Sequence, residues 1–169
     1  MEEKVLFNAT LCLLIKDDSV LLAKKARKIG AGCWNGYGGG VEENETLLDS
    51  AIRELKEEST LIAKKEDLEK VAIVDFHNMK TDGGIFVCRV HFFLIRNWEG
   101  EPKETEEMLN PTFFKINNLP LDEMMPADRK FIPLLLNGKK IIAKFTHSPF
   151  QKELLETNLL KEVENFSEE

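Results

Sequence analysis

A glycine-rich segment that runs directly into a helical pattern is the feature that most constrains this chain. Residues 28–41 (KIGAGCWNGYGGGV) contain six glycines, and so many permissive residues imply backbone that bends sharply or approaches a ligand closely. A helix is predicted from about Thr46 to Ser59, where Thr46 followed by Asp49 resembles a capping box. The apolar residues of this helix form one stripe at helical spacing: Leu47, Leu48, Ala51, Ile52 and Leu55.

Apolar, β-prone segments on both sides of this region predict a mixed sheet. Residues 5–16 and 20–25 are separated by three polar residues, which is typical of a β-hairpin. The long apolar run at 84–95 is typical of a central strand. The strands predicted after the helix are 70–77, 84–95, about 112–116 and 139–145.

Two further helices are predicted in the C-terminal half. Pro126 is placed to open a short helix over 126–136. The segment SPFQKELLETNLLKEVENF has leucines at amphipathic spacing, so we expect an extra C-terminal helix within 147–169. No repeat, low-complexity segment or linker interrupts the chain, and residues 1–169 are therefore expected to form one α+β domain.

Composition disfavours several classes of function. The 169 residues are 43% hydrophobic, which is enough for one globular core. The net charge is −7 and the isoelectric point is about 5.2, whereas a protein that binds polymeric nucleic acid needs a basic surface. No apolar run is long enough to span a membrane, and the N-terminus has no signal-peptide core. Three widely spaced cysteines without a CxxC pair favour a reducing compartment. Taken together, these features lead us to expect a cytoplasmic protein with no polymeric nucleic-acid partner and no membrane partner.

Three glutamates lie close together near the end of the predicted helix, in the sequence RELKEEST. Glu54, Glu57 and Glu58 project from one flank of the apolar stripe, since residues three and four apart are neighbours on a helix. Such a face is either solvated or a metal site. Repulsion between neighbouring glutamates costs about 0.2–0.5 kcal/mol per pair, which is too small to decide between the two.

The spacing around these glutamates resembles the signature of the Nudix hydrolases. Five residues separate Gly39 from Glu45, seven more separate Glu45 from Arg53, and the sequence then continues as RELKEESTL. Every specified position of G-x5-E-x7-R-E-U-x-E-E-x-G-U, where U is aliphatic, matches except the last glycine, which is Thr60 here. The resemblance implies a Nudix fold, in which a mixed sheet lies between helices in an α/β/α arrangement. Glycine at a helix end readily becomes left-handed, so Thr60 either accepts strain there or the chain leaves by another turn.

The resemblance also implies a metal site and a hydrolytic mechanism. Magnesium prefers oxygen ligands, and several carboxylates can hold it against a phosphate chain, so we expect Mg²⁺ as the cofactor, with Mn²⁺ as an alternative. Arg53 and Glu45 are expected mainly to orient the loop and the helix. One of Glu57, Glu58 and Glu107 is expected to be the base for the attacking water. The implied catalytic residues are Glu57, Glu58, Glu107 and Arg53, and the implied metal ligands are Glu54, Glu57, Glu58, Glu107 and the carbonyl of Gly38.

A wider resemblance extends over most of residues 5–146. The segments 30–46 and 106–136 are similar to those of MutT-type Nudix enzymes that hydrolyse oxidised purine nucleoside triphosphates. This implies Mg²⁺-dependent hydrolysis of a small-molecule purine nucleoside triphosphate to the monophosphate and pyrophosphate, sanitising the nucleotide pool, by a monomer or weak dimer. The alternatives are a Nudix hydrolase of an undamaged dNTP or another nucleoside-diphosphate-linked substrate, and a non-catalytic nucleotide-binding module, for which Thr60 is the sequence hint.

Substrate contacts follow from the same resemblance. Asn35 matches an asparagine that reads the base edge, since an amide both donates and accepts hydrogen bonds, although Asn-Gly also marks turns. Three of the implied residues also have a plain structural explanation. Phe76 is equally typical of a hydrophobic core, Lys25 is equally typical of a surface lysine, and Glu107 is typical of an exposed acidic loop. The implied substrate-binding residues are Thr10, Lys25, Asn35, Tyr37, Gly38, Gly39, Phe76, Met125 and Asp128.

The chain departs from these enzymes where the base should be held. In MMPADRK, Met125 stands in place of a tryptophan and Ala127 in place of the first of two aspartates, so that only Asp128 remains. Ile29 replaces a phenylalanine nearby. An aromatic platform is exchanged for a flexible thioether, and the loss of a hydrogen-bonding partner relaxes discrimination. The sequence therefore supports the hydrolytic chemistry but does not select a base.

Overall fold

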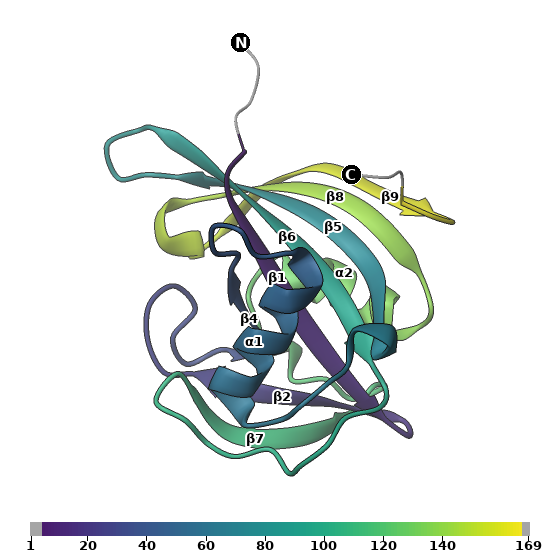
Figure 1. The fold of residues 1–169 in the computed structure, drawn as a ribbon. Coiled ribbons are helices and arrows are strands. Elements are labelled where there is room, and N and C mark those ends of the chain that lie inside the picture. The colour runs from purple at the N-terminus through teal and green to yellow at the C-terminus, as the bar shows by residue number, and fades with distance from the viewer. Residues whose placement is uncertain (1–4, 167–169) are drawn as a thin grey trace.

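One mixed sheet organises residues 5–166, which the computed structural model describes (Figure 1). Within this range the strands are β1 (Val5–Lys16), β2 (Ser19–Lys25), β3 (Trp34–Asn35), β4 (Tyr37–Gly40), β5 (Leu68–Met79), β6 (Ile85–Ile95), β7 (Met108–Lys115), β8 (Lys140–His147) and β9 (Leu154–Val163). The helices are α1 (Leu47–Ser59) and α2 (Asp128–Leu136), and the 3₁₀ turns are η1 (Lys65–Asp67), η2 (Leu121–Glu123) and η3 (Pro149–Gln151). No helix in the described range is long and apolar enough to cross a membrane.

The sheet combines parallel and antiparallel pairs. Its main path follows the order β3-β2-β1-β6-β5-β8-β9. β1 is parallel to β6 and β5 is parallel to β8, whereas β5 and β6 are antiparallel. β4 pairs with β1, and β7 pairs with β2, outside this path. The predictions of a mixed sheet and of an N-terminal hairpin between β1 and β2 are therefore confirmed.

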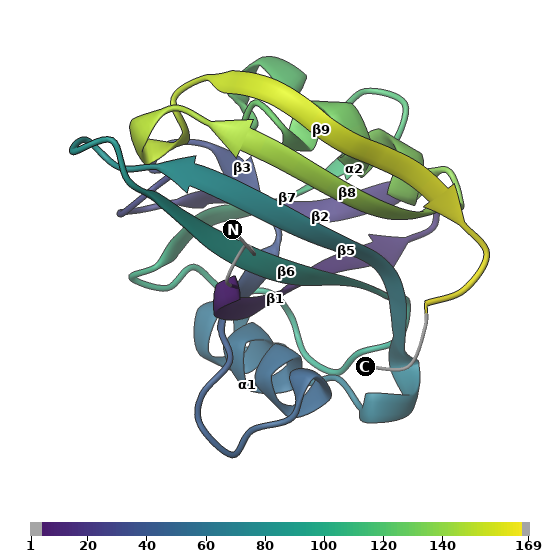
Figure 2. The same cartoon turned by 90° about the horizontal axis from the view of Figure 1, so that it is seen from above.

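Each face of the sheet has its own core, because successive side chains of a strand point to opposite faces. On one face, Cys12 of β1 belongs to the same buried cluster as Ala51 and Leu55 of α1. On the other face, Leu13 shares a cluster with Phe131 of α2. Figure 2 shows the two helices on opposite sides of the sheet. The predicted α/β/α arrangement is confirmed.

Both ends of α1 are capped by nearby residues. At its start the Thr46 hydroxyl accepts a hydrogen bond from the Asp49 N–H (3.1 Å), as the capping-box pattern predicts. At its end Thr60 is left-handed, with φ 70° and ψ 1°, and its N–H donates to the Lys56 carbonyl. The Thr60 hydroxyl donates to the Glu101 carbonyl at 3.3 Å. Thr60 therefore adopts the helix ending typical of a glycine and accepts the strain.

The C-terminal segment is a strand, so the extra helix predicted within 147–169 is wrong for the described residues; residues 167–169 lie outside that range. β9 pairs antiparallel with β8 along its length. Without β9, β8 would present a row of unpaired backbone N–H and C=O groups, and the pairing satisfies them. Leu155 and Leu160, which belong to the predicted helical stripe, remain 51% and 41% exposed. Pairing with an open sheet edge overrides the local helical periodicity.

The glycine-rich segment contains the short strands β3 and β4, which were not predicted. β4 pairs with β1 in a register that places Gly39 beside Thr10. A Cβ on Gly38 would collide with the backbone carbonyl of Thr10, so this approach requires glycine. The pairing holds the glycine backbone between β1 and α1.

The substitution Thr60→Gly is expected to stabilise the protein. A left-handed L-residue costs about 1–2 kcal/mol, and glycine gives back about 0.5–1 kcal/mol of that gain through its freedom in the unfolded chain. We therefore expect the free energy of unfolding to rise by about 0.5–1 kcal/mol, measured by urea denaturation. Thr60→Ala is the matched control, because it keeps a Cβ and should gain less. Equal stabilisation by both variants, or a loss in Thr60→Gly, would contradict the assignment of strain.

Candidate active site

The glutamates of α1 line a cavity of about 550 Å³, which we call the acidic cavity. Its walls come from β1, β3, β4, β6, α1, the end of β2 with the residues that follow it, and the residues around the start of β7. The predicted residues that line it are Thr10, Lys25, Asn35, Gly38, Gly39, Glu54, Glu57, Glu58 and Glu107. The fold thus gathers residues from one end of the chain to beyond its middle around a single concentration of carboxylates.

Arg53 ties α1 to the glycine-rich segment. Its guanidinium donates to both oxygens of Glu45 (2.6 and 2.9 Å) and to the carbonyl of Gly40 (3.1 Å). It also donates to Glu54 (3.0 Å) and Glu57 (3.2 Å). The Arg53 bonds lower the pKa of Glu45 to about 2, and the Glu45 bonds raise the pKa of Arg53, so both groups stay charged. Arg53 is absent from the lining of the acidic cavity, which suits an orienting role.

Glu58 and Glu54 lie against the glycine backbone with only part of their charge compensated. Oε1 of Glu58 accepts a hydrogen bond from the Gly38 N–H at 2.9 Å. Burial raises the pKa of Glu58 to about 7; the Glu54 carboxylate adds to this shift, whereas the Gly38 bond opposes it. Burial also raises the pKa of Glu54, in spite of its bond to Arg53. Two crowded carboxylates of this kind favour a bound cation.

Glu107 reaches the same cavity from the segment before β7. Its carbonyl accepts a hydrogen bond from the Ala26 N–H (2.9 Å), which fixes it beside the end of β2. Two N–H donors of Arg27 bind its carboxylate and lower its pKa. Lys25 also lines the cavity; burial lowers its pKa, while the surrounding carboxylates oppose that shift. Arg27 was not predicted as a site residue, although its place in the basic run KKARK was a signal.

A second cavity of about 280 Å³, which we call the apolar cavity, adjoins the first. The two cavities share Lys25, Ile29 and Asn35 among their lining residues. The apolar part of its wall consists of Phe7, Leu11, Ile29, Phe76, Phe86, Cys88, Val90, Phe92 and Met125, and the polar part consists of Lys25, Asn35, Asn78, Asp128 and Gln151. Apolar walls with a few polar groups are typical of a site for a flat organic ring.

Two polar groups of the apolar cavity have restricted roles. Oδ1 of Asn35 accepts a hydrogen bond from the Gly36 N–H (2.9 Å), which leaves its NH₂ group to donate. Asn35 therefore serves a turn and lines the cavity at the same time. Burial raises the pKa of Asp128 to about 7, with Lys25 opposing the shift. Near neutral pH the Asp128 carboxyl thus exchanges between a neutral donor and a charged acceptor.

The predicted substrate-binding residues line one or both of these cavities, except for Tyr37, which lines neither. The Tyr37 side chain is fully buried in the cluster beneath α1, because it points from β4 into that core. Phe76 belongs to both the core and the cavity wall. Asn78 and Gln151 line the apolar cavity and were not predicted. Asn78 lies two residues after Phe76, so strand alternation was a signal for it, whereas Gln151 fell in the segment predicted as a helix.

Comparison with known proteins identifies the family. A family model described as the NUDIX domain matches residues 6–135. The chain is 39% identical over 158 residues to the oxidized purine nucleoside triphosphate hydrolase of Mus musculus, covering 93% of this chain and 96% of the mouse protein. This chain belongs to the Nudix family. The Danio rerio protein with the same description is 39% identical over 136 residues, covering 80% of this chain and 83% of the fish protein. The crystal structure of a MutT protein from Bacillus halodurans matches with a TM-score of 0.77 at 26% identity, covering 92% of this chain and 97% of that one.

Nudix hydrolases generally use a divalent metal ion and act on small-molecule nucleotides. The donor set of the acidic cavity fits such an ion, because it is made of carboxylate oxygens and glycine backbone. The raised pKa values of Glu54 and Glu58 show that negative charge there lacks a full counter-charge. Within the described residues, no group of three or more acidic, histidine or cysteine side chains lies in an arrangement that could by itself hold a metal ion.

The substitution Gly39→Ala is expected to impair metal binding and leave the fold intact. A Cβ on Gly39 would lie 2.5 Å from the Glu54 carboxylate, which is the movable end of a side chain. Displacement of a ligand should weaken metal affinity by about 10- to 100-fold, which titration calorimetry with Mn²⁺ would measure. Gly38→Ala is the contrast, because its Cβ meets the Thr10 backbone and should lower thermal stability. Unchanged metal affinity in folded Gly39→Ala would remove Glu54 from the ligand set.

Metal affinity is expected to depend on pH through Glu58. Its pKa of about 7 means that a proton competes with the metal below neutral pH. Apparent affinity should therefore rise as the pH increases from 6 to 7, by at most about tenfold for this one group, and then level off. Calorimetry at pH 6, 7 and 8 would measure this dependence. In Glu58→Gln the metal affinity should be lower and should no longer change between pH 6 and 7. If the full pH dependence persisted in this variant, a group other than Glu58 would be responsible for it.

Proposed function

We propose that this protein hydrolyses purine nucleoside triphosphates, oxidised purines included, to the nucleoside monophosphate and pyrophosphate with Mg²⁺ as its metal. The observation that carries the proposal is the joining of two unlike cavities through Lys25 and Asn35. One has the carboxylates and cations suited to a metal-bound phosphate chain, and the other has the apolar walls and polar groups suited to a base. The mouse and zebrafish relatives described as oxidized purine nucleoside triphosphate hydrolases support the same substrate class.

The acidic cavity would hold the triphosphate. Glu54, Glu57 and Glu58, with the Gly38 backbone and Glu107, would bind the metal, as their shared lining of the cavity supports. When bound, Mg²⁺ supplies charge neutralisation on the phosphate chain and polarises water. Glu57, Glu58 or Glu107 takes the proton from the attacking water, since all three carboxylates line the cavity.

The basic residues at the mouth of the acidic cavity complete the phosphate site. Lys25 lines both cavities, which supports a role for its ammonium between the phosphate chain and the sugar or base. Arg27 holds the Glu107 carboxylate and offers its remaining donors to phosphate oxygens. Arg53 stays outside the cavity and keeps α1 in register with Gly40 and Glu45.

The apolar cavity would hold the purine. Asn35 donates through its free NH₂ group, and Asp128 donates or accepts according to its protonation state. Phe76 and Met125 supply apolar surface against the ring. We expect the protein to act in the cytoplasm as a monomer or weak dimer, where removal of damaged triphosphates protects newly made nucleic acid.

The decisive experiment is a pyrophosphate-release assay over canonical dNTPs, 8-oxo-dGTP, 2-hydroxy-dATP and nucleoside-diphosphate derivatives with Mg²⁺. Hydrolysis of purine triphosphates to the monophosphate and pyrophosphate is expected. Glu57→Gln and Glu58→Gln should each lower kcat by about 100-fold or more while thermal stability is retained, since both remove charge from the metal site.

The control for these variants is Glu66→Gln, because Glu66 is an exposed glutamate of η1 outside the cavities. It should keep wild-type kcat. Full activity in both cavity variants would refute the proposed mechanism. Nucleotide binding without any turnover would indicate a non-catalytic binding module, and hydrolysis confined to nucleoside-diphosphate derivatives would reassign the substrate.

A further inference from the structure

Asn78, near the end of β5, is a buried amide that neither the Nudix signature nor the metal site involves. Its residue is only 2% exposed, and it lines both the apolar cavity and an adjacent cavity of about 320 Å³. We call the latter the turn cavity, because it lies between the turn that joins β5 to β6 and the turn η3. Asn78 therefore belongs to the wall where the two cavities meet.

The Asn78 amide has a free acceptor. Its Nδ2 donates to the carbonyl of Phe76 at 3.3 Å. This bond fixes the orientation of the amide, since the flipped amide would set two oxygens against each other. Oδ1 is buried and no donor among the described residues binds it. A buried acceptor that no protein group binds can be satisfied by a donor from outside the fold, either a ligand or a water molecule.

The surroundings of Asn78 suit a neutral base rather than a phosphate. His147 of β8 is its partner in the β5–β8 register and is fully buried. The His147 ring stacks on Phe76, with centroids 5.7 Å apart, and burial lowers its pKa to about 4, so it carries no charge near pH 7. Next to Asn78, β5 and β8 therefore present aromatic surface and an uncharged imidazole.

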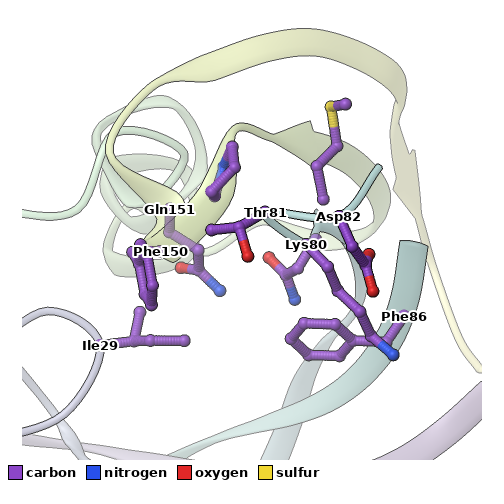
Figure 3. A pocket seen from close by; sticks show the side chains of 10 residues that line it. Ile29, Lys80, Thr81, Asp82, Phe86, Phe150 and Gln151 are labelled. Atoms are coloured by element: carbon purple, nitrogen blue, oxygen red, sulfur yellow. The ribbon is translucent and has the colours of Figure 1, made fainter. Parts of the chain in front are cut away.

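The turn η3 places a second amide at the same end of the apolar cavity. Gln151 lines the apolar cavity and the turn cavity, and Figure 3 shows it with Ile29 and Phe150 on one side of the turn cavity, across from Lys80 and Phe86. Phe150 and Gln151 both have positive backbone φ angles, 61° and 56°, which residues other than glycine seldom adopt. Hydrogen bonds between Ser148 and Glu153 close this strained turn.

We propose that Asn78 is a specificity-determining residue that accepts a hydrogen bond from an N–H group of the purine, while Gln151 closes the same end of the cavity. The proposal rests on the proposed function. Asn35 offers donors and Asn78 offers an acceptor, so together they match a base edge that carries both an acceptor and an N–H. A base without that N–H leaves Oδ1 of Asn78 buried and unpaired, and this unpaired acceptor is the physical basis of discrimination.

The test compares triphosphates that differ at one donor group of the base. The pairs are dGTP with dITP (the 2-amino group), dATP with purine deoxyriboside triphosphate (the 6-amino group), and 8-oxo-dGTP with dGTP (N7–H together with the C8 oxygen). In the wild type, kcat/KM should differ by about 10- to 100-fold within the pair whose N–H meets Asn78. In Asn78→Leu that ratio should fall to near one, and the ratios of the other pairs should persist. Asn78→Thr keeps an acceptor and should restore part of the ratio.

Two controls separate base reading from a structural role. Asn78→Leu removes an unpaired buried acceptor, so its melting temperature should stay level or rise. Thr81→Ala alters the turn cavity without touching the apolar cavity and should leave all ratios unchanged. Retention of every ratio in folded Asn78→Leu would overturn the proposal while hydrolysis itself stands. If the wild type hydrolyses none of the triphosphates, the proposed function fails. The dissociation constants of the corresponding monophosphates then test Asn78 directly. A ratio of dissociation constants that falls to near one for a single pair in Asn78→Leu supports the role of Asn78, and unchanged ratios refute it.

Discussion

The absence of side chains at Gly38 and Gly39 is the constraint on which the rest of the site depends. The Glu54 carboxylate occupies the space that a Cβ on Gly39 would fill, and the Gly38 N–H binds Glu58. Arg53 then connects α1 to the carbonyl of Gly40, so the loop and the helix hold each other. Because the glutamates pack against backbone, their positions are set by the fold more than by the rotamers of long side chains.

Close packing of the glutamates has an electrostatic consequence. Burial, with a smaller contribution from neighbouring carboxylates, raises the pKa values of Glu54 and Glu58, while Arg27 lowers that of Glu107. The metal-free protein therefore carries carboxylates that disfavour their own ionisation, and a cation would relieve this repulsion. Thr60 adds backbone strain at the end of the same helix. The strain and the repulsion both lie on α1, the helix that carries the proposed catalytic groups, where function can justify a local cost in stability.

The parts that sequence could predict are those set by local spacing. The helix, its cap and the position of its glutamates follow from periodicity within one element and the loop before it, and α1 confirms them. The strand β9 did not follow, because its leucines fit a helical period and only the open edge of β8 makes a strand more favourable. The burial of Tyr37 was unpredictable for a related reason, since the direction of its side chain depends on how β4 pairs with β1. The position of Asn78 in the wall of the apolar cavity could have been predicted, because Asn78 lies on the same face of β5 as Phe76.

In the proposed function, the acidic cavity carries the hydrolytic chemistry and the apolar cavity carries base recognition. Met125 and Ala127 remove an aromatic platform and a carboxyl group from the base site that the family resemblance implies, and neither residue lines the acidic cavity. Asn78 brings a polar group to the apolar cavity from β5 instead. Because Lys25 and Asn35 are the polar residues common to both cavities, the base-reading wall can change while the glutamates and the glycine backbone stay in place. Under the proposed function, a change of base preference therefore requires no movement of the groups that would bind metal and activate water.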